Sequence, residues 1–172
     1  MKTVLLGYMG SGKSTVAKLL AKALNLSFTD LDDYIEKKEK KSIKELFKAK
    51  GEIYFRLQES KYLKEVLEDA SPGIIALGGG TPCYANNMEL IKQFSESFYL
   101  KGSIATISER LQSEKSQRPL IAALNEAQLT EFIAKHLFER RAYYEQASKT
   151  VIIDGKSAEA IKDELLIGLK TI

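Results

Sequence analysis

The chain of 172 residues has about the length of one domain and can bury a substantial core. Its 44% hydrophobic and 28% charged residues are ordinary for a soluble globular protein, and a net charge of +3 gives no indication of a nucleic-acid or membrane partner. Cys83 is the single cysteine, which excludes an internal disulfide and a cysteine-based metal site. No apolar run approaches the length of a membrane span. We therefore expect a cytoplasmic, monomeric protein with one domain over residues 1–172.

The first predicted element is a β-prone apolar run over residues 1–6, which ends at Gly7. Residues 7–15, GYMGSGKST, match the pattern G-x-x-x-x-G-K-[ST]. Apolar residues then recur at helical spacing over residues 16–24. A strand, a glycine loop and a helix in this order are the context in which the motif binds phosphates, whereas a glycine turn with a surface lysine is the simpler alternative.

The chemistry of phosphate explains the residue types in this motif. Glycines allow backbone N–H groups to approach the phosphates closely, and the N-terminus of the following helix adds its positive dipole end. Lys13 can reach the β- and γ-phosphates, and the Ser14 hydroxyl can ligate Mg²⁺. The sequence therefore predicts a nucleoside triphosphate site formed by Gly10, Ser11, Gly12, Lys13, Ser14 and Thr15.

Downstream of this helix, short apolar runs alternate with amphipathic helical patterns. The strand-like runs cover residues 26–30, 74–77, 97–100 and 150–154. Helical patterns cover residues 32–41, 42–51, 52–68, 86–93, 104–111, 126–146 and 158–169, and a polar segment covers 112–125. Ser42 and Glu45 have the spacing of a capping box. The alternation predicts an α/β fold whose parallel sheet is covered on both faces and binds ligands at the carboxyl ends of its strands.

Two aspartates follow the second predicted strand. If the chain is extended there, the side chains of Asp30 and Asp32 point the same way, toward the glycine loop. One of them could hold Mg²⁺ while the other takes a proton from an acceptor hydroxyl. Helix capping is the alternative interpretation, because acidic residues favour the first turn of a helix. Asp33 points elsewhere and has no assigned role.

Two arginines fall on predicted inward faces of helices. Arg56 interrupts an apolar stripe that includes Ile53, Leu57 and Leu63, and Arg140 continues the apolar face that begins at Leu129. An inward arginine is unfavourable unless it meets an anion. An internal salt bridge is the structural alternative for each. As a pair, they suggest an anionic acceptor bound through a carboxylate or phosphate.

Three further features lie at expected loop positions. Gly78, Gly79 and Gly80 follow a buried strand and exceed what a tight turn needs, so we expect close approach to a ligand. Arg118, in the polar segment 112–125, could move over the triphosphate and stabilise the transferring charge. A solvated loop arginine is the alternative. His136 is the only histidine; we expect it on a helix surface and propose no histidine base.

Together these motifs resemble the shikimate kinase family over almost the whole chain. The resemblance rests on GYMGSGKST (7–15), D-L-D (30–32), Arg56, LGGG (77–80), RPL (118–120) and Arg140-x-x-x-Tyr144-Glu145. It implies a P-loop NTPase sandwich with a five-stranded parallel sheet, similar to nucleoside monophosphate kinases. It also implies transfer of the γ-phosphoryl group of ATP, with Mg²⁺, to the 3-hydroxyl of shikimate in aromatic amino-acid biosynthesis.

The resemblance also implies roles for single residues. Asp30 belongs to the magnesium shell, and Asp32 binds the acceptor hydroxyl as its base. Arg56 and Arg140 hold the carboxylate of shikimate, the glycines 78–80 its ring hydroxyls, and Arg118 is the arginine of a lid over residues 112–125. The acceptor-binding helices would cover about residues 32–62. Arg110 and Lys156 are the expected adenine-side contacts.

One departure from the family pattern leaves a residue assignment open. In the family, a proline usually follows the carboxylate-binding arginine, with one residue between them. Counted from Arg140, that position is occupied by Ala142, and the residue between is a second arginine, Arg141. Either Arg140 or Arg141 could therefore hold the acid. Another kinase of the same fold, acting on gluconate or a nucleoside monophosphate, is the rival function. A nucleotide-dependent switch is the alternative from another class, although the guanine-binding N-K-x-D pattern is absent.

Overall fold

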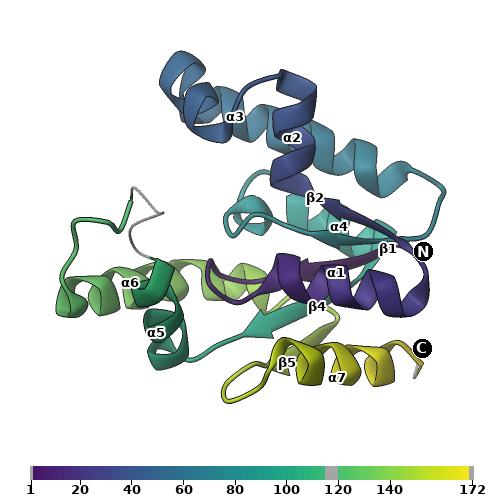
Figure 1. Ribbon diagram of the computed structural model, residues 1–172. Helices are drawn as coiled ribbons and strands as arrows, with labels where there is room; N and C mark the ends of the chain where they lie inside the picture. The colour runs from purple at the N-terminus through teal and green to yellow at the C-terminus, as the bar shows by residue number, and fades with distance from the viewer. Residues whose placement is uncertain (1, 115–119, 171–172) are drawn as a thin grey trace.

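The computed structural model describes residues 2–114 and 120–170 (Figure 1). Its core is a sheet of five parallel strands in the order β2-β3-β1-β4-β5. The strands are β1 (Lys2–Leu6), β2 (Ser27–Asp30), β3 (Gly73–Ala76), β4 (Ser95–Lys101) and β5 (Lys149–Ile152). Every connection between them contains at least one helix, as parallel pairing requires. The α/β fold predicted from the alternating pattern is confirmed.

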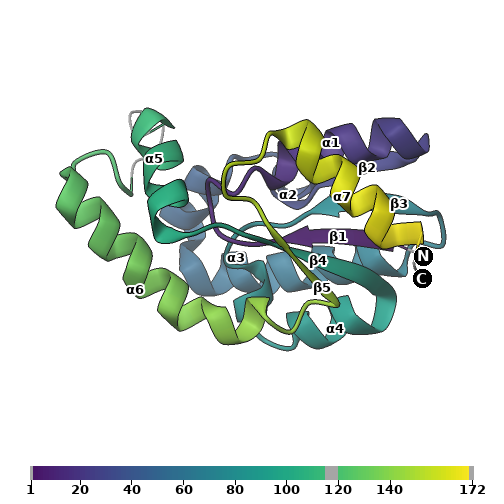
Figure 2. The same ribbon diagram turned by 90° about the horizontal axis from the view of Figure 1, so that it is seen from below.

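Two layers of helices enclose the sheet. The helices are α1 (Lys13–Leu24), α2 (Leu31–Glu39), α3 (Ile43–Glu68), α4 (Asn87–Phe94), α5 (Ile104–Glu114), α6 (Glu126–Tyr144) and α7 (Ala158–Lys170), with a short 3-10 turn, η1 (Thr81–Cys83). In Figure 2, α1 and α7 cover one face of the sheet, and α3, α4 and the end of α6 lie on the other. Among the described helices, none combines the length and apolar composition needed to span a membrane.

The central strand explains why this sheet is stable. All five residues of β1 are buried, and Val4 is paired with Ile75 of β3 and Ser97 of β4. A strand that is covered on both faces needs a continuous apolar run, and residues 4–6 supply it. Because β1 lies in the middle, the loop after Leu6 emerges at the centre of the sheet's carboxyl edge.

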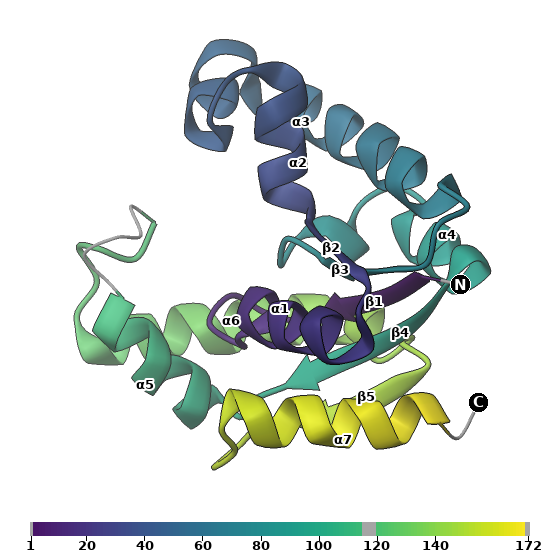
Figure 3. The ribbon, with the colours of Figure 1, turned by 45° about the vertical axis from the view of Figure 1, so that its right-hand side comes forward.

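Helix α3 begins and bends at residues that the sequence predicts. The Ser42 hydroxyl accepts from the Glu45 amide at 3.2 Å, and the Glu45 carboxylate accepts from the Ser42 amide at 2.7 Å, which confirms the capping box. Gly51 has φ 81° and ψ 172°, so α3 is two helical segments joined at the predicted boundary. Figure 3 shows α2 and α3 standing away from the sheet on one side of the glycine loop, with α5 and the first half of α6 on the other.

Candidate active site

The loop over residues 7–12 joins β1 to α1 at the centre of the sheet. Gly12 is the N-cap of α1 with φ 85°, a left-handed conformation that favours glycine at the point where the loop enters the helix. Lys13 begins the helix and folds back across the loop, where its Nζ donates to Tyr8 O at 2.9 Å and Ser11 Oγ at 3.4 Å. A cation, a helix N-terminus and a glycine backbone therefore converge on one volume, as phosphate binding requires.

Ser14 and Asp30 meet beside this loop. Ser14 Oγ donates to Asp30 Oδ2 at 2.6 Å, while Asp30 Oδ1 accepts from the Asp32 amide at 3.0 Å. Asp30 is therefore the N-cap of α2, as the capping interpretation expects, and it also faces the P-loop, as the alternative interpretation expects. A hydroxyl and a carboxylate side by side fit Mg²⁺, which uses one or two protein oxygens together with phosphates and water.

Asp32 occupies a different backbone conformation from the one we expected. It lies in the first turn of α2 instead of extended chain, because the Asp30 cap begins the helix at Leu31. Its carboxylate still reaches the site, because it lies against the glycine loop after β3. Asp32 Oδ1 is 2.9 Å from the position that a Cβ atom on Gly78 would take. Burial, followed by the nearby carboxylates of Asp30 and Glu59, raises the pKa of Asp32 to about 6, and Lys13 opposes the shift. A carboxylate with this pKa can accept a proton near neutral pH.

The glycines after β3 are packed from three sides. A side chain at Gly80 would collide with the Arg56 guanidinium at 2.9 Å, and one at Gly79 would approach the Met9 amide at 3.3 Å. The buried hydroxyl of Tyr144 donates to Gly79 O at 2.5 Å and anchors the loop from behind. The glycines are thus required for close approach by neighbouring groups, beyond the needs of a turn.

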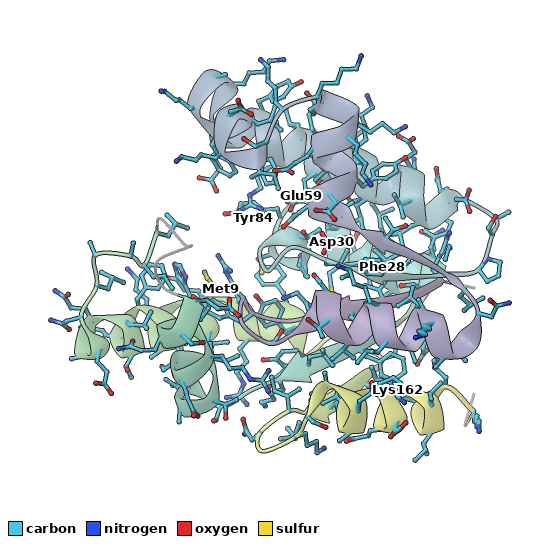
Figure 4. All side chains as sticks on the ribbon, in the orientation of Figure 1. Met9, Phe28, Asp30, Glu59, Tyr84 and Lys162 are labelled. Atoms are coloured by element: carbon cyan, nitrogen blue, oxygen red, sulfur yellow. The ribbon has the colours of Figure 1, made fainter. Side chains whose placement is uncertain are left out.

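Arg56 is held by a carboxylate that we did not predict. Its Nη1 donates to Glu59 Oε2 at 2.9 Å, and its guanidinium carbon lies 4.0 Å from the centre of the Tyr84 ring. Glu59 is 1% exposed and also accepts from Thr81 Oγ1 at 2.7 Å. In Figure 4, Glu59, Tyr84 and Asp30 lie between the α2–α3 pair and the sheet. The internal salt bridge, our structural alternative for Arg56, is therefore present.

The prediction that Ile53 and Leu57 belong to a buried apolar face beside Arg56 is wrong. Ile53 and Leu57 are 81% and 65% exposed, while Leu63 is buried as expected. The buried face of this part of the helix passes through Phe55, which is 3% exposed, and Glu59 instead of Ile53 and Leu57. Glu59 could have been found, because it lies three residues after Arg56 and four before Leu63, on the same helix face.

Arg140 and Arg141 point in different directions. Arg140 Nη1 lies 3.6 Å from the position that a Gly79 side chain would take, and its guanidinium carbon lies 5.6 Å from the centre of the Tyr8 ring. Arg141 is 66% exposed and is bonded to Glu145 at 2.7 Å. In the described part of the chain, no carboxylate forms an ion pair with Arg140. The geometry therefore favours Arg140 as the anion-binding residue.

A single cavity of about 630 Å³ joins most of these groups. Its lining includes Gly10, Ser11, Gly12, Lys13, Ser14, Thr15, Asp30, Asp32, Gly78, Gly79, Arg110 and Lys156. Arg110 Nη1 donates to Ser11 O at 3.3 Å, and Lys156 is paired with Glu164 at the far end. Arg56, Gly80 and Arg140 border the cavity without lining it. Arg118 lies outside the described residues.

His136 differs from our expectation of a helix-surface residue. Its ring is half-buried, and Nδ1 lies 3.0 Å from the hydroxyl of Tyr8 in the P-loop. The four-residue spacing from Phe132, whose ring centre lies 4.2 Å from that of His136, was the signal for this inward position.

The fold and the cavity together define a P-loop kinase that acts on a small molecule. The family model described as "Shikimate kinase" matches residues 9–170 of the chain. The chain belongs to the shikimate kinase family. It is 49% identical over 166 residues to a shikimate kinase of Flavobacterium johnsoniae, with 96% of each chain covered. The family suggested by the sequence motifs is thereby confirmed.

Solved structures agree with this family membership. A shikimate kinase from Bacteroides thetaiotaomicron has a TM-score of 0.91 at 34% identity, with 99% of this chain and 98% of that chain covered. A shikimate kinase from Acinetobacter baumannii, solved in complex with shikimate, has a TM-score of 0.86 at 30% identity, with coverage of 99% and 93%. A gluconokinase from Sinorhizobium meliloti, at 19% identity and a TM-score of 0.61, shares the fold alone.

Proposed function

We propose that the protein transfers the γ-phosphoryl group of Mg-ATP to the 3-hydroxyl of shikimate. One observation carries this proposal: the proton-accepting Asp32 opens into the same cavity as Lys13 and the Ser14–Asp30 pair. Two arginines border that cavity on the acceptor side. The site thus has a place for a triphosphate, for a hydroxyl and for an acidic group.

The nucleotide lies on the P-loop in this proposal. The backbone of Gly10, Ser11 and Gly12, with the N-terminal amides of α1 at Lys13, Ser14 and Thr15, holds the β- and γ-phosphates. Lys13 exchanges its bonds to Tyr8 O and Ser11 Oγ for phosphate oxygens. Arg110 and Lys156 border the far end of the cavity and contact the adenosine. Arg118, on a lid over residues 112–125, adds positive charge to the phosphates.

Ser14 and Asp30 are the residues that would hold Mg²⁺. The chemistry that Mg²⁺ would supply there is positive charge against the negative charge that develops on the phosphates during transfer. Among the described residues no group of three or more His, Cys, Asp or Glu side chains forms a metal cage. A site with few protein ligands suits Mg²⁺, which keeps several waters and takes the rest of its ligands from phosphates.

The acceptor lies between Asp32 and the two arginines. Asp32 accepts the proton of the attacking hydroxyl, and its pKa of about 6 leaves it ionised at neutral pH. The glycine backbone at Gly78, Gly79 and Gly80 contacts the ring hydroxyls, because side chains are missing there. Arg140 and Arg56 bind the carboxylate through charge-assisted hydrogen bonds. We assign helices over about residues 32–62 to this acceptor side.

Phosphoryl transfer then follows from position and charge. The acceptor oxygen is held in line with the γ-phosphorus, Asp32 removes its proton, and the phosphoryl group moves from the β-phosphate oxygen to the acceptor. Lys13 and Arg118 stabilise the charge on the equatorial oxygens and on the departing ADP. The protein itself forms no covalent bond to the phosphoryl group.

The experiment measures ADP release from Mg-ATP with shikimate, gluconate or AMP added in parallel. We expect strong stimulation by shikimate alone. Stimulation by gluconate or AMP would keep the phosphate site but reassign both arginines. If none of the three stimulates ADP release, the proposed acceptor chemistry is wrong and a nucleotide-dependent switch becomes the better hypothesis.

A further inference from the structure

Tyr8, the second residue of the P-loop, carries a buried hydroxyl that has no role in the proposed phosphate site. The side chain is 1% exposed, and the hydroxyl lies 3.0 Å from His136 Nδ1 on α6. A buried phenol requires a hydrogen-bond partner, and a phenylalanine would fill the same space without that requirement. The pair therefore connects two segments that are 128 residues apart in sequence.

The hydrogen bond joins two neutral groups. Burial raises the pKa of Tyr8 to about 12, so its hydroxyl keeps its proton and can donate. Burial, followed by the charge of Arg140, lowers the pKa of His136, so the imidazole is neutral and can accept at Nδ1. Phe132, one turn earlier on α6, packs against the imidazole with ring centres 4.2 Å apart. The histidine is therefore fixed from its own helix as well.

Arg140 lies one helical turn after His136 on the same helix. Its guanidinium carbon lies 5.6 Å from the centre of the Tyr8 ring, so α6 touches Tyr8 through the hydroxyl and through the ring. The other side of the guanidinium faces Gly79, at 3.6 Å from the position that a side chain would take. No ion pair to a described carboxylate fixes Arg140; the Tyr8 ring supports its guanidinium on the P-loop side, and the Tyr144 hydroxyl is a further side-chain neighbour.

We propose that Tyr8 and His136 are positioning residues for the acceptor: their hydrogen bond fixes α6 against the P-loop and so presets Arg140 to receive the acceptor's carboxylate. This inference rests on the proposed function, in which Arg140 binds an acid. A preset arginine loses less conformational freedom when the acceptor binds, so the pair contributes to acceptor affinity without touching the acceptor. The pair connects the P-loop directly to α6, the helix that carries Arg140.

The test compares Tyr8→Phe, His136→Leu and the double variant by steady-state kinetics. Each single variant is expected to raise KM for shikimate about 5- to 20-fold. This factor corresponds to the free energy of about one buried hydrogen bond. KM for ATP and kcat should stay within about two-fold. Because both variants remove the same bond, the double variant should be no worse than either single variant. His136→Asn, which keeps an acceptor atom near Nδ1, should recover most of the loss.

Two results in these kinetics would overturn the proposal. Additive effects in the double variant would mean that the residues act separately, and equal rises in both KM values would mean a general disturbance of the P-loop. Phe138→Ala is the matched control, because this side chain is on α6 and 85% exposed. It should leave both KM values unchanged.

A second measurement does not depend on the acceptor. The Hε–Nε signal of Arg140 in an NMR spectrum, assigned with R140K, should be sharp in the wild type and broadened or shifted in Tyr8→Phe. An unchanged signal would overturn the positioning role. If shikimate fails to stimulate ADP release while this signal responds, the proposed acceptor is wrong but the Tyr8–His136 link stands.

Discussion

The hydroxyl of Ser14 in the first turn of α1 donates a 2.6 Å hydrogen bond to Asp30, the last residue of β2. The two oxygens of Asp30 are divided between two tasks, since Oδ2 faces Ser14 and Oδ1 caps α2 through the Asp32 amide. One carboxylate therefore contacts both the Ser14 corner of the P-loop, where we propose Mg²⁺, and the start of the helix that carries Asp32. A change at Asp30 must be designed to separate the two.

Asp30→Asn and Asp30→Ala separate these tasks. Asparagine caps a helix about as well as aspartate, so Asp30→Asn should keep α2 but lose the charge that attracts Mg²⁺. We expect the Mg²⁺ concentration for half-maximal activity to rise about ten-fold or more, the value of a hydrogen bond to a charged group. Asp30→Ala should in addition lose about 1 kcal/mol of unfolding free energy. A magnesium titration and urea unfolding measure the two effects, and an unchanged magnesium requirement in both variants would remove Asp30 from the metal site.

Asp32 should give the reaction an acidic limb in its pH profile. The pKa of Asp32 in the free protein is about 6, and the base must be ionised to accept a proton. We therefore expect kcat/KM for shikimate to rise with pH up to about 6 and to level off above it. In Asp32→Asn the limb should disappear and turnover should fall by a factor on the order of 10² to 10⁴. A profile of the variant that keeps both the limb and the rate would contradict the base assignment.

The same carboxylate should destabilise the folded protein at neutral pH. Its folded pKa of about 6 lies above the ordinary 3.8, so the folded state binds more protons between these values and stability falls as pH rises from about 4 to about 6. At pH 8 the free energy of unfolding of Asp32→Asn should therefore exceed that of the wild type by about 1–3 kcal/mol. Urea unfolding measures this difference. The difference should shrink below pH 6 and be nearly absent at pH 4. A difference that is independent of pH would point to packing instead.

Arg140 and Arg141 form a matched pair for testing the acceptor carboxylate site. Arg140→Ala should weaken shikimate binding by about 2–5 kcal/mol, the cost of truncating one partner of a close charged pair, and leave ATP affinity largely intact. Arg141→Ala removes an exposed ion pair with Glu145 and should change shikimate affinity by less than about two-fold. Calorimetric titration of each variant with both substrates measures this. Equal loss of ATP binding in Arg140→Ala would identify a structural arginine.

Glu59 should matter more than its neighbour Glu52, although both contact Arg56. Glu59 is buried with Arg56 and Thr81 bonded to it, whereas Glu52 is 56% exposed and lies 3.5 Å from Arg56 Nε. Glu59→Gln removes the buried partner charge and should cost about 3–5 kcal/mol of stability and raise KM for shikimate. Glu52→Gln should cost less than about 1 kcal/mol. Similar effects in the two variants would show that burial of Glu59 is not what holds Arg56.

The sequence predicts the fold well because its signals are local. The apolar run of residues 1–6, the Ser42 capping box and Gly51 each act through neighbours in the chain, and the structure agrees at all three. Element boundaries differ by a few residues, as for α6, which ends at Tyr144 instead of residue 146. The five strand-like runs correspond to the five strands of the sheet.

The site is predictable only where its residues follow a pattern along the chain. The P-loop and the glycines 78–80 are each a continuous run in the sequence, and the structure brings the P-loop, Gly78 and Gly79 to one cavity. Helical spacing places Glu59 beside Arg56 and His136 beside Phe132, but their other partners, Thr81 and Tyr8, lie 22 and 128 residues away in sequence. Nothing in helical spacing states which distant hydroxyl a polar side chain meets. Arg140 and Arg141 stayed open because Ala142 replaces the proline of the family pattern; the docked helix separates them, since Arg140 faces Gly79 and Arg141 is paired with Glu145.

The strand order has a consequence for how such chains can change by recombination. Residues 30–80 run from the end of β2 to the glycines after β3 and lie to one side of β1, so exchange of this one contiguous stretch would replace nearly all acceptor contacts at once. The P-loop, Arg110 and Lys156 would be inherited from the other parent. Arg140 lies outside the exchanged stretch, on α6. A hybrid of two such kinases would therefore carry Asp32, Arg56 and the glycines of the new parent but Arg140 of the old one, so the two arginines that we propose for the acceptor's carboxylate would come from different parents.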